Sequence, residues 1–143
     1  MKLNINPLKD AVNQLEEAID IHDSESDPRL KRHLRAAVIQ AFEFTYELSF
    51  KMIRRYLEMV SVSPAEVDKL SFNNLLRQAF VQDLVRSDIQ KWRDYRRYRG
   101  ITSHTYNEKK AQMVFQYAPS FLEEAKYLVY QLQKKGESLD AAT

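Results

Sequence analysis

The segment from Ala111 to Leu132 has the apolar pattern of an amphipathic α-helix, and this pattern constrains the fold more than any other feature of the chain. Its apolar residues recur in steps of three and one, which places them on one face of a helix. These residues are Ala111, Val114, Phe115, Ala118, Phe121, Leu122, Ala125, Leu128, Val129 and Leu132. The whole chain has only two glycines and four prolines, so it has little material for tight turns and hairpins. The sequence therefore favours an all-helical protein.

The length and composition are those of one soluble globular domain. With 143 residues, 44% of them hydrophobic and 29% charged, the chain is large enough to bury a core without covalent or metal cross-links. The absence of cysteine excludes disulfides, thiol catalysis and cysteine-ligated zinc. No apolar run resembles a signal peptide or a membrane span, so we expect a cytoplasmic protein without a membrane partner.

Two long helices are predicted in the N-terminal part. The first begins near Pro7, and its apolar stripe ends before a polar loop at residues 22–27. The second runs from about Pro28 to Val60 and has Asp27 as its N-cap. The stripe of the first helix consists of Leu8, Val12, Leu15 and Ile19, and the continuous apolar face of the second consists of Leu30, Leu34, Ala37, Ala41, Phe44, Leu48 and Met52.

Shorter helices are predicted between these and the last one. One begins at Ser63, and another covers residues 72–80. A basic helix then begins at Asp88 and ends at about Arg99, where Gly100 stops it.

These elements predict an antiparallel up-and-down helical bundle of about five helices. Residues 1–135 would form one domain, and residues 136–143, which begin with Gly136, would form a loose C-terminal tail.

The basic helix combines cations with aromatic side chains. Five of the nine residues from 91 to 99 are basic, namely Lys91, Arg93, Arg96, Arg97 and Arg99, and they alternate with Trp92, Tyr95 and Tyr98. A basic patch with aromatic residues can hold a phosphate backbone and stack bases. The alternative is a solvated helix face whose arginines pair with acidic neighbours. If Trp92 is anchored in the core, Arg99 on the same face is drawn toward a groove.

The segment from Arg99 to Tyr106 joins the basic helix to the last one. Arg99 can clamp a phosphate through its fork of donors, and His104 is suited to moving protons at neutral pH. Thr105 and Glu108 match a capping box, which would place Tyr106 in the first turn of the last helix, where free N–H groups favour an anion. This combination predicts a site for phosphate chemistry, with RNA as the preferred substrate.

Three polar residues of the second helix, Glu43, Glu47 and Lys51, follow one another at i, i+4 spacing. The two carboxylates could be metal ligands or a catalytic pair, but no histidine accompanies them at ligand spacing. We therefore expect them to support a polar helix face or an interface, and we expect no metal or other cofactor. The remaining histidines, His22 and His33, are predicted to be surface or loop residues.

A set of residues spread over nearly the whole chain points to a known family. It comprises Ile39–Phe44, Glu47, Lys51 and Tyr56-Leu57 in the second helix, and Trp92, Arg99, His104, Tyr106 and Asn107-Glu108 further on. With these residues the chain resembles the HEPN superfamily, specifically the nucleotidyltransferase substrate-binding proteins. The resemblance implies a four-to-five-helix bundle that forms a homodimer, in which the Arg-x4-6-His segments of both protomers line one cleft. One position departs from the family, because the residue after the arginine is commonly Asn and is Gly100 here.

The resemblance also implies residue roles, because ribonuclease members of this family cleave RNA without a metal. Arg99 would bind the scissile phosphate and stabilise its added charge, and His104 would be the general acid or base for attack by the 2′-OH. Tyr106 matches the tyrosine that a partner, a minimal nucleotidyltransferase acting as antitoxin, can modify with AMP. The RNA backbone would be held by Lys91, Arg93, Arg96 and Arg97, and the site would be supported by Glu43, Glu47, Lys51 and Trp92.

Two other functions stay open. The chain could be a non-catalytic subunit that binds substrate or nucleotide for a separate nucleotidyltransferase, with the same residues binding phosphate without turnover. It could also be a purely structural dimerising bundle, in which residues 99–106 make caps and salt bridges. The chain has no glycine-rich phosphate loop and no nucleotidyltransferase motif of its own, so we do not expect it to transfer nucleotides itself.

Overall fold

The computed structural model describes residues 3–142, with side chains for residues 3–136, and every regular element in this part is helical. The elements are α1 (Asn6–Ser24), α2 (Pro28–Val60), α3 (Pro64–Asp68), α4 (Phe72–Val81), α5 (Ile89–Gly100), the 3-10 turn η1 (Thr102–His104) and α6 (Glu108–Ala142). The predicted all-α class is therefore confirmed, and α2 has the predicted bounds.

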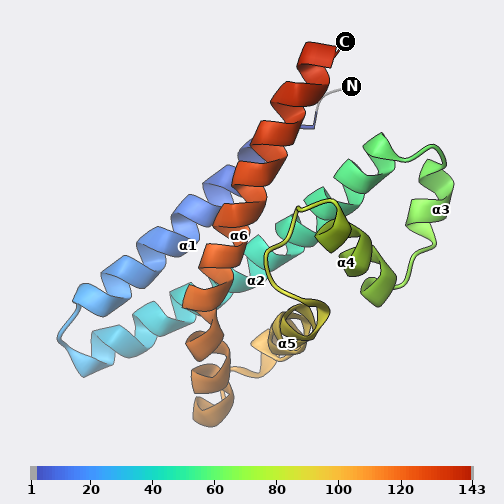
Figure 1. The fold of residues 1–143 in the computed structure, drawn as a ribbon. Coiled ribbons are helices and arrows are strands. Elements are labelled where there is room, and N and C mark those ends of the chain that lie inside the picture. The colour runs from blue at the N-terminus through green and yellow to red at the C-terminus, as the bar shows by residue number, and fades with distance from the viewer. Residues whose placement is uncertain (1–2, 143) are drawn as a thin grey trace.

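Three long helices, α1, α2 and α6, form the body of the bundle, and α1 runs antiparallel to both of the others (Figure 1). The shorter helices α3, α4 and α5 carry the chain from the end of α2 back to the start of α6 (Figure 1). Asp27 begins α2 as predicted, because its Oδ1 accepts a hydrogen bond from the backbone N–H of Arg29 at 2.9 Å. Helix α5 ends one residue past the predicted Arg99, because Gly100 is still helical and Ile101 is the C-cap.

His22 differs from its prediction, because it is buried and lies on the last turn of α1 rather than in the loop. Its ring centroid lies 4.5 Å from that of Phe115 on α6, and its Nδ1 lies 2.9 Å from Asp23 Oδ1. The aromatic contact excludes water from the ring while Asp23 satisfies one ring nitrogen, which is why a histidine can be buried here. His33 is exposed on α2, in agreement with its prediction.

Five aromatic side chains at the centre of the core fix α5 against α2 and α6. They are Phe42 and Tyr46 of α2, Trp92 and Tyr95 of α5, and Phe121 of α6. Phe121 contacts the other four at ring-centroid distances of 4.9 to 5.9 Å, and three of these pairs are edge-to-face. Such pairs stabilise a core beyond the area they bury. The cluster therefore sets the direction of α5 and the position of Arg99 at its end.

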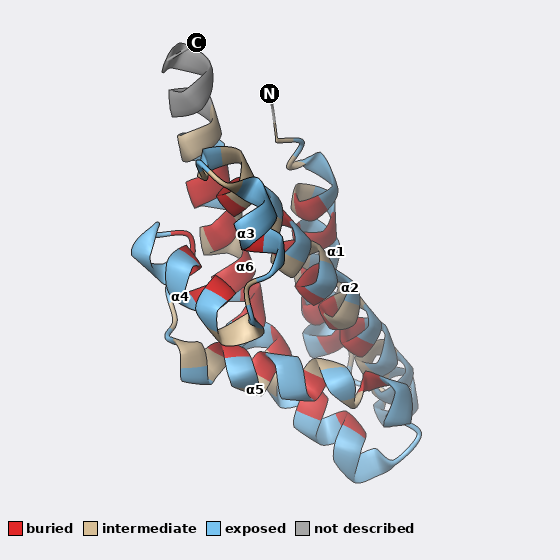
Figure 2. Cartoon of the chain, turned by 90° about the vertical axis from the view of Figure 1, so that its right-hand side faces the viewer, coloured by how far each residue is buried: buried red, intermediate tan, exposed pale blue. Residues whose placement is uncertain are grey.

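The apolar face that the sequence indicates on α2 is, for the most part, not the face that the single chain buries. Leu30 and Phe44 are 49% and 54% exposed, and exposed residues run along α2 beside buried ones (Figure 2). Thr45 lies on the buried face instead, because its hydroxyl donates to the carbonyl of Ala41 at 2.7 Å and needs no water. The buried residues of α2 are Val38, Ile39, Phe42, Thr45, Tyr46, Ser49, Met52, Ile53, Tyr56 and Leu57.

The predicted capping box at the start of α6 is not formed. Asn107 caps the helix, because its Oδ1 accepts a hydrogen bond from the backbone N–H of Lys110 at 3.2 Å. The Thr105 hydroxyl is unavailable, because it donates to the carbonyl of Thr102 at 3.1 Å. Tyr106 consequently precedes α6 rather than lying in its first turn.

The last helix continues past the position where the sequence indicates its end. Its backbone is helical through Gly136 as far as Ala142, so helix covers residues 136–142 of the stretch predicted as a loose tail. Thr143 and the side chains of residues 137–143 lie outside the described part of the chain.

Candidate functional site

The N-terminal end of α5 is fixed by a buried carboxylate of α6. Glu124 is 2% exposed, and its Oε1 accepts hydrogen bonds from Trp92 Nε1 at 3.2 Å and from the backbone N–H of Arg86 at 2.9 Å. Its Oε2 accepts from the Ser87 hydroxyl at 2.8 Å. Trp92 is thus anchored in the core. The sequence does not single out Glu124, because glutamates are mostly exposed and its neighbour Glu123 carries the same charge.

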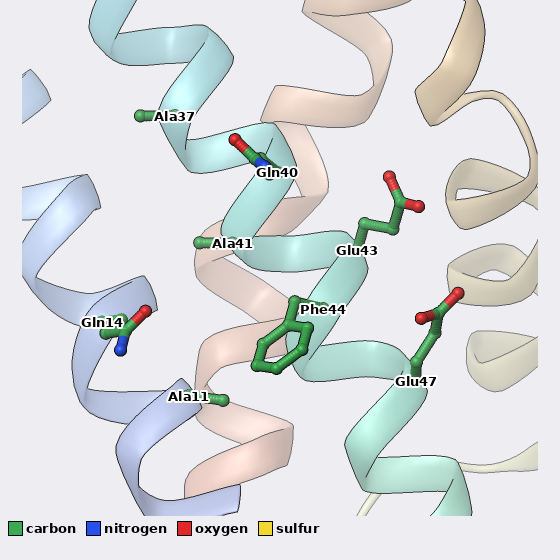
Figure 3. Close-up of a pocket in the computed structure, with 8 residues that line it drawn as sticks. All are labelled: Ala11, Gln14, Ala37, Gln40, Ala41, Glu43, Phe44 and Glu47. Atoms are coloured by element: carbon green, nitrogen blue, oxygen red, sulfur yellow. The ribbon is translucent and has the colours of Figure 1, made fainter. Parts of the chain in front are cut away.

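Arg99 projects from the last turn of α5 toward α2. Its Nη2 donates to Glu47 Oε1 and lies 3.5 Å from Glu43 Oε1, and both carboxylates extend from the side of α2 away from α1 (Figure 3). The hydrogen bond to Glu47 is the main reason that the pKa of Arg99 is raised above its ordinary value. Both contacts use Nη2, so Nη1 and Nε donate to no described residue. A phosphate can therefore bind the open edge of the guanidinium.

Two threonines hold the turn between Arg99 and His104. The buried Thr102 hydroxyl donates to the carbonyl of Arg99 at 2.8 Å, and the Thr105 hydroxyl donates to the carbonyl of Thr102. His104 is exposed, and the described residues offer its imidazole no hydrogen-bond partner. The rings of His104 and Tyr106 are 6.4 Å apart, and Tyr106 is 87% exposed. An ordered turn thus presents an imidazole and a phenol to solvent, and no sequence pattern pointed to Thr102.

The aromatic residues of the basic helix do not share a surface with its cations. Trp92, Tyr95 and Tyr98 are at most 5% exposed. The Tyr95 hydroxyl lies 2.6 Å from Ser120 Oγ, and burial raises its pKa to about 12. The expectation that these aromatics stack on bases is therefore wrong, because they fill the core instead.

The four other cations of α5 are held against neighbouring side chains. The partners are Tyr117 for Lys91, Asn73 for Arg93, Phe72 for Arg96 and Tyr98 for Arg97. The three aromatic contacts place the cation 4.6 to 5.3 Å from the ring centroid and orient it, and Arg97 also lies 3.8 Å from Asp94 Oδ1 in an ion pair. The outer side of α5 therefore carries ordered positive charges.

The structure brings only some of the predicted supporting residues together. Arg99 meets Glu47, whereas Lys51 is exposed and makes no ion pair among the described residues. Burial raises the pKa of Tyr46 to about 12, against the opposing charges of Arg96 and Arg99. Tyr46 therefore keeps its proton at neutral pH and cannot act as a base.

The carboxylates that hold Arg99 also line a surface groove of about 480 Å³, here called the α2 groove. Its lining comprises Ala11 and Gln14 of α1 and Ala37, Gln40, Ala41, Glu43, Phe44 and Glu47 of α2 (Figure 3). Arg99 thus lies beside a groove with an exposed apolar wall.

Among the described residues, no three or more His, Cys, Asp or Glu side chains are grouped as a metal ion would require. In the same part of the chain, no helix is both long and apolar enough to cross a bilayer. The α2 carboxylates are instead engaged by Arg99.

Comparisons with known proteins agree on one family. The family described as nucleotidyltransferase substrate binding protein like matches residues 3–134. A curated Haemophilus influenzae protein named probable ribonuclease HepT is 36% identical over 141 residues, which cover 95% of this chain and 96% of the relative. The solved structure of HI0074 from Haemophilus influenzae, described as the fold of a substrate-binding domain of a nucleotidyltransferase, matches with a TM-score of 0.82 and 35% identity. That match covers 91% of this chain and 99% of the other.

Proposed function

Because the chain belongs to the family of nucleotidyltransferase substrate-binding-like proteins, we propose that it is a metal-independent RNA endonuclease of the HEPN toxin type. The observation that carries this proposal is the short hydrogen-bonded turn that holds both Arg99, with an open donor edge, and His104, with an unbonded imidazole. The relative named probable ribonuclease HepT supports the same chemistry.

In the proposed reaction, His104 removes the proton of a ribose 2′-OH, and the 2′-oxygen attacks the adjacent phosphorus. The bond between phosphorus and the 5′-oxygen breaks, that oxygen takes up a proton, and the products are a 2′,3′-cyclic phosphate and a 5′-hydroxyl. Arg99 binds the phosphate oxygens through Nη1 and Nε and stabilises their added charge in the transition state. The RNA backbone on either side is held by the outer cations of α5, Lys91, Arg93, Arg96 and Arg97.

The proposed active form is a homodimer that buries the α2 groove. Phe44 stands 54% exposed at this groove, and Glu47 both lines it and holds Arg99. A second copy on the groove would therefore bring the Arg99 segments of both protomers into one cleft. Phe44→Glu should yield a monomer by analytical ultracentrifugation, with Phe80→Glu, an equally exposed phenylalanine on α4, as the matched control. If the Phe44 variant stays dimeric, the dimer uses another surface.

The proposed control is modification of the Tyr106 hydroxyl with AMP by a partner nucleotidyltransferase. Its 87% exposure makes the phenol accessible, and its ring lies beside that of His104. A nucleotide attached there would place a phosphate near Arg99 and block access to the imidazole. Intact-mass measurement after incubation with a cognate nucleotidyltransferase and ATP tests this step. Tyr106→Phe should abolish the mass increase and Tyr130→Phe, the control at another exposed tyrosine, should not.

A second candidate function is a non-catalytic subunit that binds substrate or nucleotide for a separate nucleotidyltransferase. Gly100 favours it, because the family commonly has a polar residue at this position and the structure leaves the space empty. A Cβ added at Gly100 would meet no atom within 4 Å. In this function the open edge of Arg99 would bind a nucleotide phosphate without turnover.

The experiment that separates the two functions is RNA cleavage in EDTA by the purified chain, beside Arg99→Ala and His104→Ala. His33→Ala is the matched control, because His33 is exposed on α2 and outside the site. The ribonuclease proposal requires that cleavage is lost in the first two variants and kept in the control. Equal cleavage by all four proteins would identify a contaminant and refute it. Nucleotide binding without cleavage by the unmodified protein would favour the second function.

A further inference from the structure

Another surface pocket, of about 400 Å³, lies at the corner where α1 turns into α2, and residues of the first turns of α6 line its remaining side. We call it the corner pocket. Its lining includes His22 of α1, Lys31, Arg32 and Arg35 of α2, and Glu108 and Phe115 of α6. The proposed chemistry uses none of these side chains, and of them only Glu108 belongs to the residues that carry the family resemblance.

The corner pocket carries an excess of positive charge that the described residues do not neutralise. Arg35 donates through Nη1 and Nη2 to both oxygens of Glu108, at 2.6 and 2.8 Å. This contact lowers the pKa of Glu108, so the pair is fully charged and forms one wall. Lys31 and Arg32 line the same pocket and make no ion pair among the described residues. Two cations are therefore left for an anionic ligand.

The lining of the corner pocket also includes an aromatic side chain, Phe115. Phe115 is half-buried, and its ring packs at 4.5 Å from the buried ring of His22. Because Asp23 bonds His22 Nδ1, the imidazole is held in place behind the phenyl ring. A planar, apolar side chain in the same pocket as two unpaired cations is the combination that nucleotides meet in single-strand binding proteins, where bases stack and phosphates are neutralised.

The corner pocket lies close to the Arg99 site along two elements. Glu108 follows His104 by four residues. On α2, Arg35 precedes Glu43 by eight residues, which corresponds to about 12 Å of helix. A strand bound at Arg99 therefore needs only a few nucleotides to reach the corner.

We propose that the corner pocket binds one nucleotide of a single-stranded RNA, with its phosphate on Lys31 and Arg32 and its base against Phe115. This inference rests on RNA being the substrate of the Arg99 site. An acidic protein segment could use the same cations, but only a nucleotide carries a phosphate and a planar base in one unit, so the pocket favours RNA.

The test measures binding of a fluorescent 2′-O-methyl oligoribonucleotide by anisotropy over a range of salt concentrations. The 2′-O-methyl group removes the attacking hydroxyl, so the assay reports binding whether or not the protein cleaves RNA. Lys31→Ala/Arg32→Ala should weaken binding about tenfold at moderate salt and reduce the slope of log K against log salt by about 1 to 1.5. Arg77→Ala/Lys134→Ala removes two exposed cations elsewhere and should leave both quantities unchanged.

Two variants of Phe115 test the contribution of the aromatic side chain to binding. Phe115→Leu should weaken binding about fivefold or more without changing the salt slope, because it removes stacking and no charge. Phe115→Tyr keeps a ring and should bind like the unmodified protein, and thermal denaturation shows whether either variant is folded. An unchanged slope in Lys31→Ala/Arg32→Ala, equal binding by folded Phe115→Leu, or equal competition by polyglutamate would each overturn the proposal.

The same variants separate this inference from the proposed function. Loss of cleavage in His104→Ala together with unchanged binding in Lys31→Ala/Arg32→Ala would support the ribonuclease proposal and refute the subsite proposal. Weakened binding in that double variant, with no cleavage by the unmodified protein, would support the subsite proposal and refute the ribonuclease proposal. If the unmodified protein does not bind the oligonucleotide, the subsite is wrong, and the cleavage assay alone decides on the ribonuclease.

Discussion

Carboxylates hold the two ends of α5 in opposite ways. At the N-terminal end, Glu124 is 2% exposed and accepts hydrogen bonds from neutral groups, including Trp92 Nε1. At the C-terminal end, the Glu47 side chain is 50% exposed and its partner, Arg99, is charged and 34% exposed. Removing Glu124 would leave buried donors unpaired, whereas Glu47 can exchange its partner with water or an anion. Helix α5, fixed at its N-terminal end, thus presents the Arg99 guanidinium to an anionic ligand that can replace Glu47 as its partner.

The largest expected effect is at Arg99, at the C-terminal end of α5. Arg99→Lys keeps the charge but loses the planar fork of donors, so we expect the rate of RNA cleavage to fall about 100-fold or more. The melting temperature should hardly change, because the contacts of Arg99 are partly in solvent. Single-turnover cleavage and thermal denaturation measure the two quantities, with Arg77→Lys on α4 as control. Near-normal cleavage by Arg99→Lys would show that a point charge suffices.

The second effect is at the buried end and concerns stability. Glu124→Ala should lower the free energy of unfolding by about 3 kcal/mol, because it leaves the buried donor of Trp92 and the half-buried donor of Ser87 without their acceptor. Glu124→Gln keeps one acceptor oxygen and should cost roughly 1 kcal/mol. Urea denaturation measures both, with Glu123→Ala, the exposed neighbour, as control. Equal costs for the alanine and glutamine variants would mean that the charge, rather than the hydrogen bonds, matters at this end.

The sequence predicts those parts of the fold that depend on local signals. The bounds of α2 follow from Asp27 and from helical periodicity, and the end of α5 lies within one residue of the predicted Arg99. It does not predict the contact between Arg99 and Glu47, because these residues are 52 positions apart and meet only once the aromatic core has oriented α5. The sequence therefore singles out Arg99 and Glu47 individually, but not the contact between them.

The errors have a common physical cause, which is that a polar group can be satisfied inside the protein. Thr45 enters the buried face of α2 by bonding the carbonyl of Ala41, so a count of apolar residues misplaces that face. His22 is buried because Phe115 and Asp23 accommodate its ring. In each case a contact from the fold overrides what the residue type indicates in isolation.

A smaller effect is expected when Glu47, the half-exposed carboxylate that holds Arg99, loses its charge. Glu47→Gln keeps a hydrogen-bond acceptor for Arg99 but weakens the hold, so we expect kcat for RNA cleavage to fall roughly fivefold. KM should fall as well, because the phosphate no longer competes with a carboxylate for the guanidinium. Steady-state kinetics separate the two constants, and Glu17→Gln on α1 is the control. A rise in KM would mean that Glu47 assists RNA binding instead of competing with it.

The smallest effect is expected at the Arg35–Glu108 pair, whose arginine is less buried than Glu124 and more buried than Glu47. Its arginine is 13% exposed and its glutamate 71% exposed, so Glu108→Gln should lower the melting temperature only slightly at neutral pH. The hydrogen bond from Arg35 lowers the pKa of Glu108 below its ordinary value of 4.5. A depressed carboxylate pKa stabilises the fold above the unfolded pKa, and this contribution is lost as the pH falls through the folded pKa. The difference in melting temperature between Glu108→Gln and the unmodified protein should therefore be present above pH 4.5 and vanish in stronger acid. A difference that persists in stronger acid would mean that packing around Arg35, rather than charge, joins α2 to α6.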